Sequence, residues 1–512
     1  MTYDAVIIGA GPNGLVAALA LAKRGKKVVV VESADAVGGH TRSIEFAPGF
    51  RAPIVEDDGV VLLNVWRLFP TGSPAISRMT RPVGMSVLNG DGSLLTLPSW
   101  SHAPAKALVA LSARDADRWP AWERRFYKFS RVMARLYQLA PPDIDTTSIG
   151  DVLALAAVGL RTRMLGKADM IEFLRVMPMS VQDLVDDEFE SAPLKAAIAS
   201  AAVRDLRQGP RSGGTVYNLV HYMVGGTGLR ARYHPISAPD AFCTAAADLL
   251  RQYGGEVRTG AEVARITVRD GATSGVALWN GDQISAPIVI STADPKRTLL
   301  TLVEPQWLDP EIGLAVRNIK LRGCTAVVMY AINAKLPDAF ASPVSLTSTT
   351  VALEKAADAA KYGEMSAEPH AEVWSPTLRW PALAPAGKHI LVARMQYAPY
   401  ALKSGAWGKA ESAALEKKVT AAIGRAIPGF AGNIQHSLVL TPKDIEARFG
   451  VTEGALTQGE IMLDQIMFMR PIPGWGRYAM PIRGLFLGGA GAHPGPGMLG
   501  GAGLLAAKAA LR

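Results

Sequence analysis

Residues Tyr3–Leu21 read YDAVIIGAGPNGLVAALAL. The first of them, Asp4–Ile8, are rich in Val and Ile and predict a short buried strand. The turn Gly9-Ala-Gly11-Pro-Asn-Gly14 follows at once, and Leu15–Arg24 then has the composition of a helix. Gly25 is a natural C-cap for that helix. This stretch therefore predicts a strand, a glycine turn and a helix in succession.

A second buried strand, Lys27–Val31, comes next and is closed by Glu32. The order strand, glycine turn, helix, strand and acid is typical of a dinucleotide-binding unit, in which the glycines let the backbone approach a pyrophosphate. The start of the helix favours the negative phosphates, and Glu32 is placed to accept hydrogen bonds from the ribose. The predicted binding residues are Gly9, Gly11, Pro12, Asn13, Gly14 and Glu32.

The carboxy-terminal end carries a second glycine-rich turn between a strand and a helix. Gly484–Leu487 predicts a short strand, Gly488–Gly503 is dense in glycine, and an Ala/Leu-rich helix runs to Arg512. Such a turn presents backbone N–H groups to an anion or a polar ring. Together the two ends predict one discontinuous nucleotide-binding domain, which the chain leaves and later returns to complete.

A Gly-Gly pair, Gly38-Gly39, lies soon after Glu32 and leads to Arg42. This arrangement resembles the flavoprotein superfamily of amine oxidases and phytoene desaturases, in which the loop passes the phosphates and ribityl chain of the cofactor. The resemblance implies FAD as the cofactor, bound in part by Gly38 and Gly39. Arg42 either adds positive charge near the pyrophosphate or is a solvated surface arginine.

Four stretches resemble the phytoene desaturase-like flavoproteins, and within them the branch of pyridine nucleotide-disulfide oxidoreductase domain-containing protein 2. They are Tyr3–Leu21, Asp187–Lys195, Asp464–Pro471 and Gly484–Gly497. The resemblance implies that Gly489 and Ala490 lie by the pyrophosphate and ribityl chain. It places His493–Leu499, with Gly497, Met498 and Leu499, along the isoalloxazine, and Val263 against the adenine.

Two departures from the family bear on substrate chemistry. Amine oxidases of the superfamily usually have Glu where this chain has Ala490, which weakens an amine-oxidase assignment. Closer relatives usually have a Gly-Gly-Met-Gly turn where this chain reads His234–Pro239 without any glycine. A close approach of backbone to ligand that depends on glycine is not available there.

These motifs predict an α/β fold with two lobes, since 512 residues exceed the size of one core. We expect a Rossmann-like FAD-binding domain from residues 1–75, 245–300 and 440–512. Residues 76–244 and 301–439 are expected to form a mixed-sheet and helical substrate lobe, the first part mostly helical. Val257–Val268 is expected to form one strand.

Bulk composition excludes several classes of partner and cofactor. The net charge is +9, but the basic residues form no long run, so we expect no nucleic-acid partner. Cys243 and Cys324 are far apart, which argues against a disulfide framework, a zinc site or a dithiol relay. Apolar stretches such as Gly14–Ala22 are too short to span a membrane. A cytoplasmic location is expected, and the basic charge suits peripheral contact with an anionic membrane. The oligomeric state is left open.

An apolar stripe of Val152, Leu155, Ala156 and Leu160 has Arg161 and Arg163 beside it. Such a stripe either dips into a membrane face or packs in the core, and core packing is the expectation.

His493 is the one titratable residue in the flavin-lining loop and is the candidate catalytic residue. The alternative is that it only shapes the turn. Arg470, Tyr478 and His221 are further candidates to line the substrate cavity. No metal cluster is evident in the sequence.

Three functions remain open on the sequence. The first is a dehydrogenase or desaturase that oxidises a C–C or C–N bond of a largely apolar molecule. The second is an FAD-dependent isomerase or saturase of a polyene, and the third is a non-catalytic flavoprotein with a regulatory role. Gly225–Gly228 is a poor second nucleotide motif because it follows no strand. We therefore expect reoxidation by oxygen or a quinone.

Overall fold

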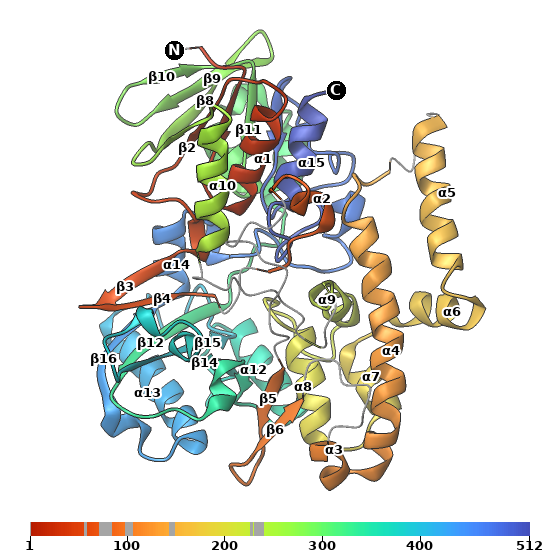
Figure 1. The fold of residues 1–512 in the computed structure, drawn as a ribbon, viewed down its shortest axis with the longest axis vertical. Helices are drawn as coiled ribbons and strands as arrows, with labels where there is room; N and C mark the ends of the chain where they lie inside the picture. Colours follow the sequence, from red (N-terminus) through yellow and green to blue (C-terminus); the bar gives the residue numbers. More distant parts are fainter. Residues whose placement is uncertain are drawn as a thin grey trace.

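Five parallel strands from distant parts of the chain form one sheet in the computed structural model, which describes residues 2–55, 59–70, 84–97, 106–142, 149–225, 229 and 240–512. Both chain termini lie at this end of the molecule (Figure 1). The sheet therefore joins the two ends of the chain, as the two glycine motifs predict. The strand order is β17 (Leu485–Leu487), β11 (Ile288–Ser291), β1 (Ala5–Ile8), β2 (Val28–Val31) and β7 (Glu256–Arg258).

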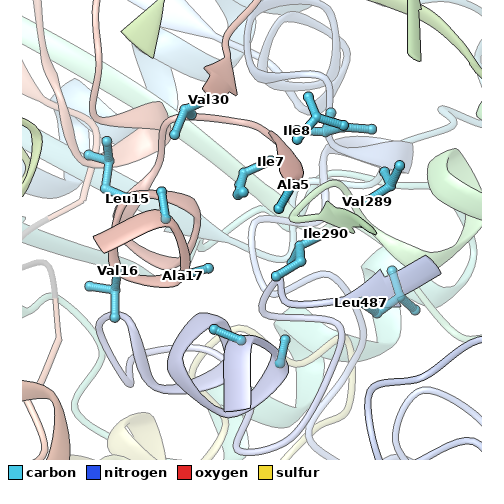
Figure 2. Close-up of a cluster of buried hydrophobic side chains, with 14 of the residues drawn as sticks. Ala5, Ile7, Ile8, Leu15, Val16, Ala17, Val30, Val289, Ile290 and Leu487 are labelled. Carbon is cyan, nitrogen blue, oxygen red and sulfur yellow. The ribbon is translucent and has the colours of Figure 1, made fainter. Parts of the chain in front are cut away.

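Helices α1 (Pro12–Ala22), α10 (Ala241–Gln252) and α15 (Gly501–Ala510) belong to the same hydrophobic core as this sheet. Figure 2 shows Ile7 of β1, Leu15 of α1 and Ile290 of β11 in that core. Helices α1 and α15 meet so closely that a Cβ on Gly503 would lie 1.9 Å from the carbonyl oxygen of Asn13. The first and last helices are thus in close backbone contact and pack on the same sheet.

The expected single strand Val257–Val268 is wrong, because the chain turns between β7 and β8 (Val263–Arg269). Gly260 has a φ of +63°, and its N–H donates to the carbonyl of Ala34. The N–H of Ala261 donates to the carbonyl of Glu32. β8 then pairs in an antiparallel three-stranded sheet with β9 (Ala272–Leu278), which pairs in turn with β10 (Gln283–Ser285).

A seven-stranded sheet forms the base of the second lobe, shown at the lower left of Figure 1. Helix α13 (Lys409–Ala426) covers one face, and the hairpin of β3 (Ser43–Ala47) and β4 (Phe50–Pro53) packs on the other. The strand order is β16 (Ile434–Leu440), β12 (Thr325–Ile332), β15 (His389–Gln396), β14 (Ala371–Trp374), β13 (Val344–Ser345), β5 (Met85–Leu88) and β6 (Leu94–Leu97). The hairpin β5–β6 gives residues 76–244 a sheet component besides their helices.

A layer of helices lies beside this sheet. The first two helices of the layer are separated at Ser112, whose hydroxyl accepts a hydrogen bond from the N–H of Asp115 and so caps the start of the second. The helices of this layer are α3 (Lys106–Leu111), α4 (Ala113–Leu136), α5 (Ile149–Arg163), α6 (Lys167–Val176), α7 (Val181–Glu188), α8 (Ala192–Ala202), α9 (Thr215–Tyr222) and α12 (Thr350–Lys361). Helices elsewhere in the fold are α2 (Leu63–Trp66), α11 (Pro310–Arg317) and α14 (Pro442–Phe449).

Core packing of the stripe on α5 is wrong. Val152 and Leu160 are 51% and 63% exposed, and Ala156 is also exposed, whereas Leu155 is half-buried. The helix stands at the edge of the molecule (Figure 1) and turns only its other face to the helical layer. An apolar stripe does not reveal from the sequence what lies opposite it.

Among the described residues, no helix combines the length and the apolarity needed to cross a bilayer. The domain boundaries and the cytoplasmic location stay predictions. His234–Pro239 and Gly226–Gly228 lie outside the described residues.

Candidate flavin site

The first glycine turn forms a tight cradle at the start of α1. Gly9 has a φ of +98°, and a Cβ on Gly14 would lie 1.9 Å from the carbonyl oxygen of Gly9. Gly11 differs, because a Cβ there would meet no protein atom within 4 Å. No side chain caps the start of α1. Its first N–H groups are therefore available to an anion, and the space beside Gly11 is open.

Glu32 fixes the other side of the cradle at the end of β2. Its side chain is 8% exposed, and its two oxygens accept hydrogen bonds from the N–H groups of Ala10 at 2.7 Å and Ala34 at 2.9 Å. Backbone N–H groups thus fix the Glu32 carboxylate beside the glycine turn. This is the position from which an acid reaches the hydroxyls of a ribose.

A cleft of about 170 Å³ runs along this cradle. Nine of the sequence-predicted site residues line it: Gly9, Gly11, Pro12, Asn13, Glu32, Gly39, Arg42, Val263 and Ala490. Arg42 is not a solvated surface arginine, because its side chain is only 18% exposed, lines the cleft and pairs with the exposed carboxylate of Asp35 at 2.9 Å; its role at the pyrophosphate stays a prediction. The structure thus brings residues 9, 263 and 490 to one cleft.

Three of the predicted residues do not line the cleft but pack behind the residues that do. Gly14 packs on Gly9, and the N–H of Gly38 donates to the carbonyl of Ala10 at 2.9 Å. Gly489 packs against Thr292, where a Cβ would lie 2.4 Å from the carbonyl oxygen.

The end of the carboxy-terminal loop is tied to the segment around Val60. The N–H of Val60 donates to the carbonyl of Gly497 at 2.7 Å, and its carbonyl accepts from the N–H of Leu499 at 2.9 Å. The side chain of Met498 joins the hydrophobic core of the helical layer. These three residues therefore lie where the two lobes meet rather than in the cleft.

Several cleft residues were missed by the sequence interpretation. Thr292 and Ala293 follow β11 directly, and ligands of parallel sheets bind at the carboxyl ends of strands, so their position was a usable signal. Gln458 links the segment after β11 to the carboxy-terminal loop. Its side-chain amide donates to the carbonyl of Thr292 and accepts from the N–H of Gly491. Arg297 and Arg448 add positive charge to the lining and come from segments without a motif.

His493 lies in a buried polar cluster that also contains Tyr137, Tyr217 and His221. The His493 ring packs edge-on against Tyr137 at 5.5 Å. The Tyr137 hydroxyl lies 2.7 Å from Nδ1 of His221, whose Nε2 lies 2.8 Å from the carbonyl oxygen of Pro496. A carbonyl only accepts, so Nε2 carries the proton, and in the neutral ring Nδ1 accepts from Tyr137. This chain of hydrogen bonds anchors the carboxy-terminal loop to α4 and α9.

Arg470 and Tyr478 are fully buried inside the protein. The Arg470 guanidinium donates to five backbone carbonyls, among them that of Ala490 at 2.7 Å. Burial lowers the pKa of Arg470 to about 10, which still leaves it charged at neutral pH. Arg470 thus fixes the position of the loop at Ala490, but its own side chain does not line the cleft.

Burial lowers the pKa of His493 to about 4, and the nearby carbonyls of Leu136 and Leu139 only partly oppose this shift. His493 is 1% exposed, and within the described chain neither ring nitrogen meets a partner with hydrogen-bond geometry. The imidazole is therefore neutral at physiological pH.

Acidification is expected to destabilise the protein through His493. The unfolded chain takes up a proton at this residue below its ordinary pKa of 6.5, while the folded protein does so only near 4, so the free energy of unfolding falls as the pH drops through this window. Between pH 7.5 and 5.5 we expect His493→Gln to remove roughly 1 kcal/mol of this pH dependence in urea unfolding. The exposed His436→Gln is the control. An unchanged pH dependence in His493→Gln would contradict the buried neutral state.

The cradle, the anchored Glu32 and the open space at Gly11 fit the adenosine and pyrophosphate of FAD, and the match to a flavin family makes the chain an FAD-dependent oxidoreductase. The chain belongs to the flavin-containing amine oxidoreductase family, which matches residues 179–444. Residues 7–81 match the NAD(P)-binding Rossmann-like domain. The predictions of the fold class, the FAD cofactor and the oxidoreductase class are confirmed.

Known proteins resemble the chain over almost its whole length. Rat pyridine nucleotide-disulfide oxidoreductase domain-containing protein 2 is 29% identical over 100% of this chain and 93% of its own. The neurosporene-forming phytoene desaturase of Rhodobacter capsulatus is 25% identical over 96% and 91%. An oxidoreductase structure from Methanosarcina mazei, 17% identical, covers 99% of each chain with a TM-score of 0.60 and supports the fold. The resemblance to phytoene desaturase-like flavoproteins is thereby confirmed.

Proposed function

We propose that the protein is a dehydrogenase or desaturase of a largely apolar molecule. The observation that carries the proposal is the state of His493, a buried neutral group beside Tyr137 at the junction of the two lobes. FAD, when bound, accepts a hydride from the substrate, and the second hydrogen leaves as a proton. The described residues that contact His493 include no charged acid–base pair, which suits such a reaction on an unactivated apolar molecule.

The chain's own residues have two roles in this proposal. Arg470 and the His221–Tyr137 hydrogen bond fix the carboxy-terminal loop, so the loop is preorganised before substrate arrives. Burial of His493 and Met498 excludes water from the junction. His493 holds a proton only weakly, so the proton that the substrate releases passes to solvent and is not stored on this residue.

The relatives support a C–C bond as the target. The Rhodobacter capsulatus relative is named for the desaturation of phytoene, an isoprenoid hydrocarbon. We propose oxygen or a quinone as the electron acceptor, because the sequence holds one convincing nucleotide motif. A saturase or isomerase on a polyene remains the second candidate, since it uses the same fold and site.

An anaerobic stopped-flow experiment tests the proposed direction of electron flow. The protein is mixed with detergent-dispersed phytoene, with limonene, or with NADH or NADPH, and the flavin absorbance is followed. We expect bleaching by at least one hydrocarbon and little or none by either nicotinamide, followed by reoxidation with oxygen or a soluble quinone. Rapid, saturable bleaching by a nicotinamide would overturn the dehydrogenase proposal and favour the saturase.

A further inference from the structure

Helix α5 presents an exposed apolar face to its surroundings. The side chains of this α5 face lie one or two helical turns apart, which places them on one side of the helix, and Met164 follows directly after its end. They are Ile149 (79% exposed), Val152 (51%), Leu153 (64%), Leu160 (63%) and Met164 (71%). A monomeric protein rarely exposes such a contiguous apolar band to water without using it for an interaction.

The fold holds this face outward. The carboxylate of Asp151 pairs with Arg477 at 2.8 Å, which ties the start of α5 to the segment before β17. Val158 and Leu165 pack against the core of the helical layer from the opposite side of the helix. α5 is therefore anchored on one side and free on the other, at the edge of the molecule (Figure 1).

Two basic residues, Arg163 and Lys167, lie at the end of this face. The acidic residues of α5 and α6 are all paired: Asp151 with Arg477, Asp169 with Lys128 at 2.6 Å, and Glu172 with Arg175 at 2.9 Å. Arg163 and Lys167, in contrast, have no carboxylate within 4.0 Å in the part of the chain that the structure describes.

We propose that the α5 face docks on the surface of a membrane that contains anionic lipid. An exposed apolar helix face with Arg and Lys beside it inserts its side chains among the acyl chains and leaves the cations at the headgroups. The net charge of +9 adds a longer-range attraction. A second copy of this chain is a poorer occupant, because it would bring the same uncompensated cations to the contact. The inference does not depend on the proposed electron donor.

Vesicle flotation tests the docking. The FAD-loaded protein is mixed with vesicles of phosphatidylcholine alone or with one third phosphatidylglycerol, at low and high salt. We expect flotation with the anionic vesicles at low salt and loss of most of it at high salt. Leu153→Ser/Leu160→Ser should weaken vesicle affinity about tenfold or more, because the removed side chains no longer enter the acyl region.

Matched variants separate this face from general effects. Leu314→Ser/Val351→Ser removes two side chains of similar exposure, 55% and 51%, on other helices and should float like the wild type. Arg163→Gln/Lys167→Gln should weaken affinity roughly tenfold. Lys355→Gln/Lys417→Gln makes the same change in net charge on exposed sites elsewhere and should have a smaller effect.

Three outcomes would overturn the proposal. They are failure of the wild type to float with anionic vesicles, equal flotation of the wild type and the Leu153/Leu160 variant, and self-association that this variant abolishes while flotation is unchanged. The last result would assign the α5 face to a contact between copies of this chain. Circular dichroism and bound FAD confirm that each variant is folded.

Discussion

Gly11→Val is expected to abolish stable FAD binding while leaving the protein folded. A Cβ at Gly11 meets no protein atom within 4 Å, and its φ of −73° is one that any residue adopts. The added side chain therefore fills the space at the start of α1 that the pyrophosphate needs. Overpacking of this kind costs about 1–3 kcal/mol, so the affinity should fall roughly 10- to 100-fold or more.

The measurement is the ratio of FAD to protein after gel filtration, together with the melting temperature of the FAD-free protein. Gly90→Val is the control, because it also adds a side chain at an open, exposed glycine but lies far from the cleft in sequence. Gly14→Val makes a useful contrast, since its Cβ would clash with the Gly9 carbonyl and should impair folding itself. A Gly11→Val protein that retains stoichiometric FAD would show that the cofactor does not approach this turn.

Deletion of Gly488–Arg512 is expected to remove soluble, FAD-loaded protein altogether. The deletion takes away α15, whose Leu504 and Leu505 are buried in the core shared with the five-stranded sheet. These two side chains alone contribute about 3–6 kcal/mol by burial, against a typical total stability of about 5–15 kcal/mol. The loss also exposes the apolar face of α1 and removes the loop with Ala490 from the cleft.

Expression, solubility and flavin content of the truncated chain check this prediction. A chain that ends at Ala510 is the matched control, because it loses only Leu511 and Arg512, which are exposed. That control should be soluble and yellow. A soluble, yellow protein lacking 488–512 would mean that the last helix is not part of the flavin domain.

The sequence predicts the flavin-binding domain well, because the local sequence motifs there are the same residues that build the site in the folded protein. The Val- and Ile-rich segments form strands of the sheet, as their composition predicts. Gly9, Gly14 and Glu32 form the turn beside these strands, as the glycine motif predicts. The glycine-dense end of the chain shows the same agreement, and Ala490 joins Gly11 at the cleft from 479 residues away in sequence (490 − 11).

Other features depend on contacts that no local pattern encodes. Arg297 and Arg448 reach the cleft from separate segments, and only the assembled fold brings them together. The shifted pKa of His493 results from burial against α4, which the loop sequence does not show. The α5 stripe has the same periodicity whether a core or a bilayer lies opposite it, so its exposure was not predictable from the residues alone.

The cofactor content of the purified full-length protein tests the central claim most directly, namely that the two ends of the chain build one flavin site. Acid or heat releases the non-covalent cofactor, which chromatography identifies and quantifies against protein concentration. We predict FAD at close to one molecule per chain and no bound nicotinamide. Recovery of FMN, of two nucleotides per chain, or of a colourless protein that does not take up added FAD would contradict it.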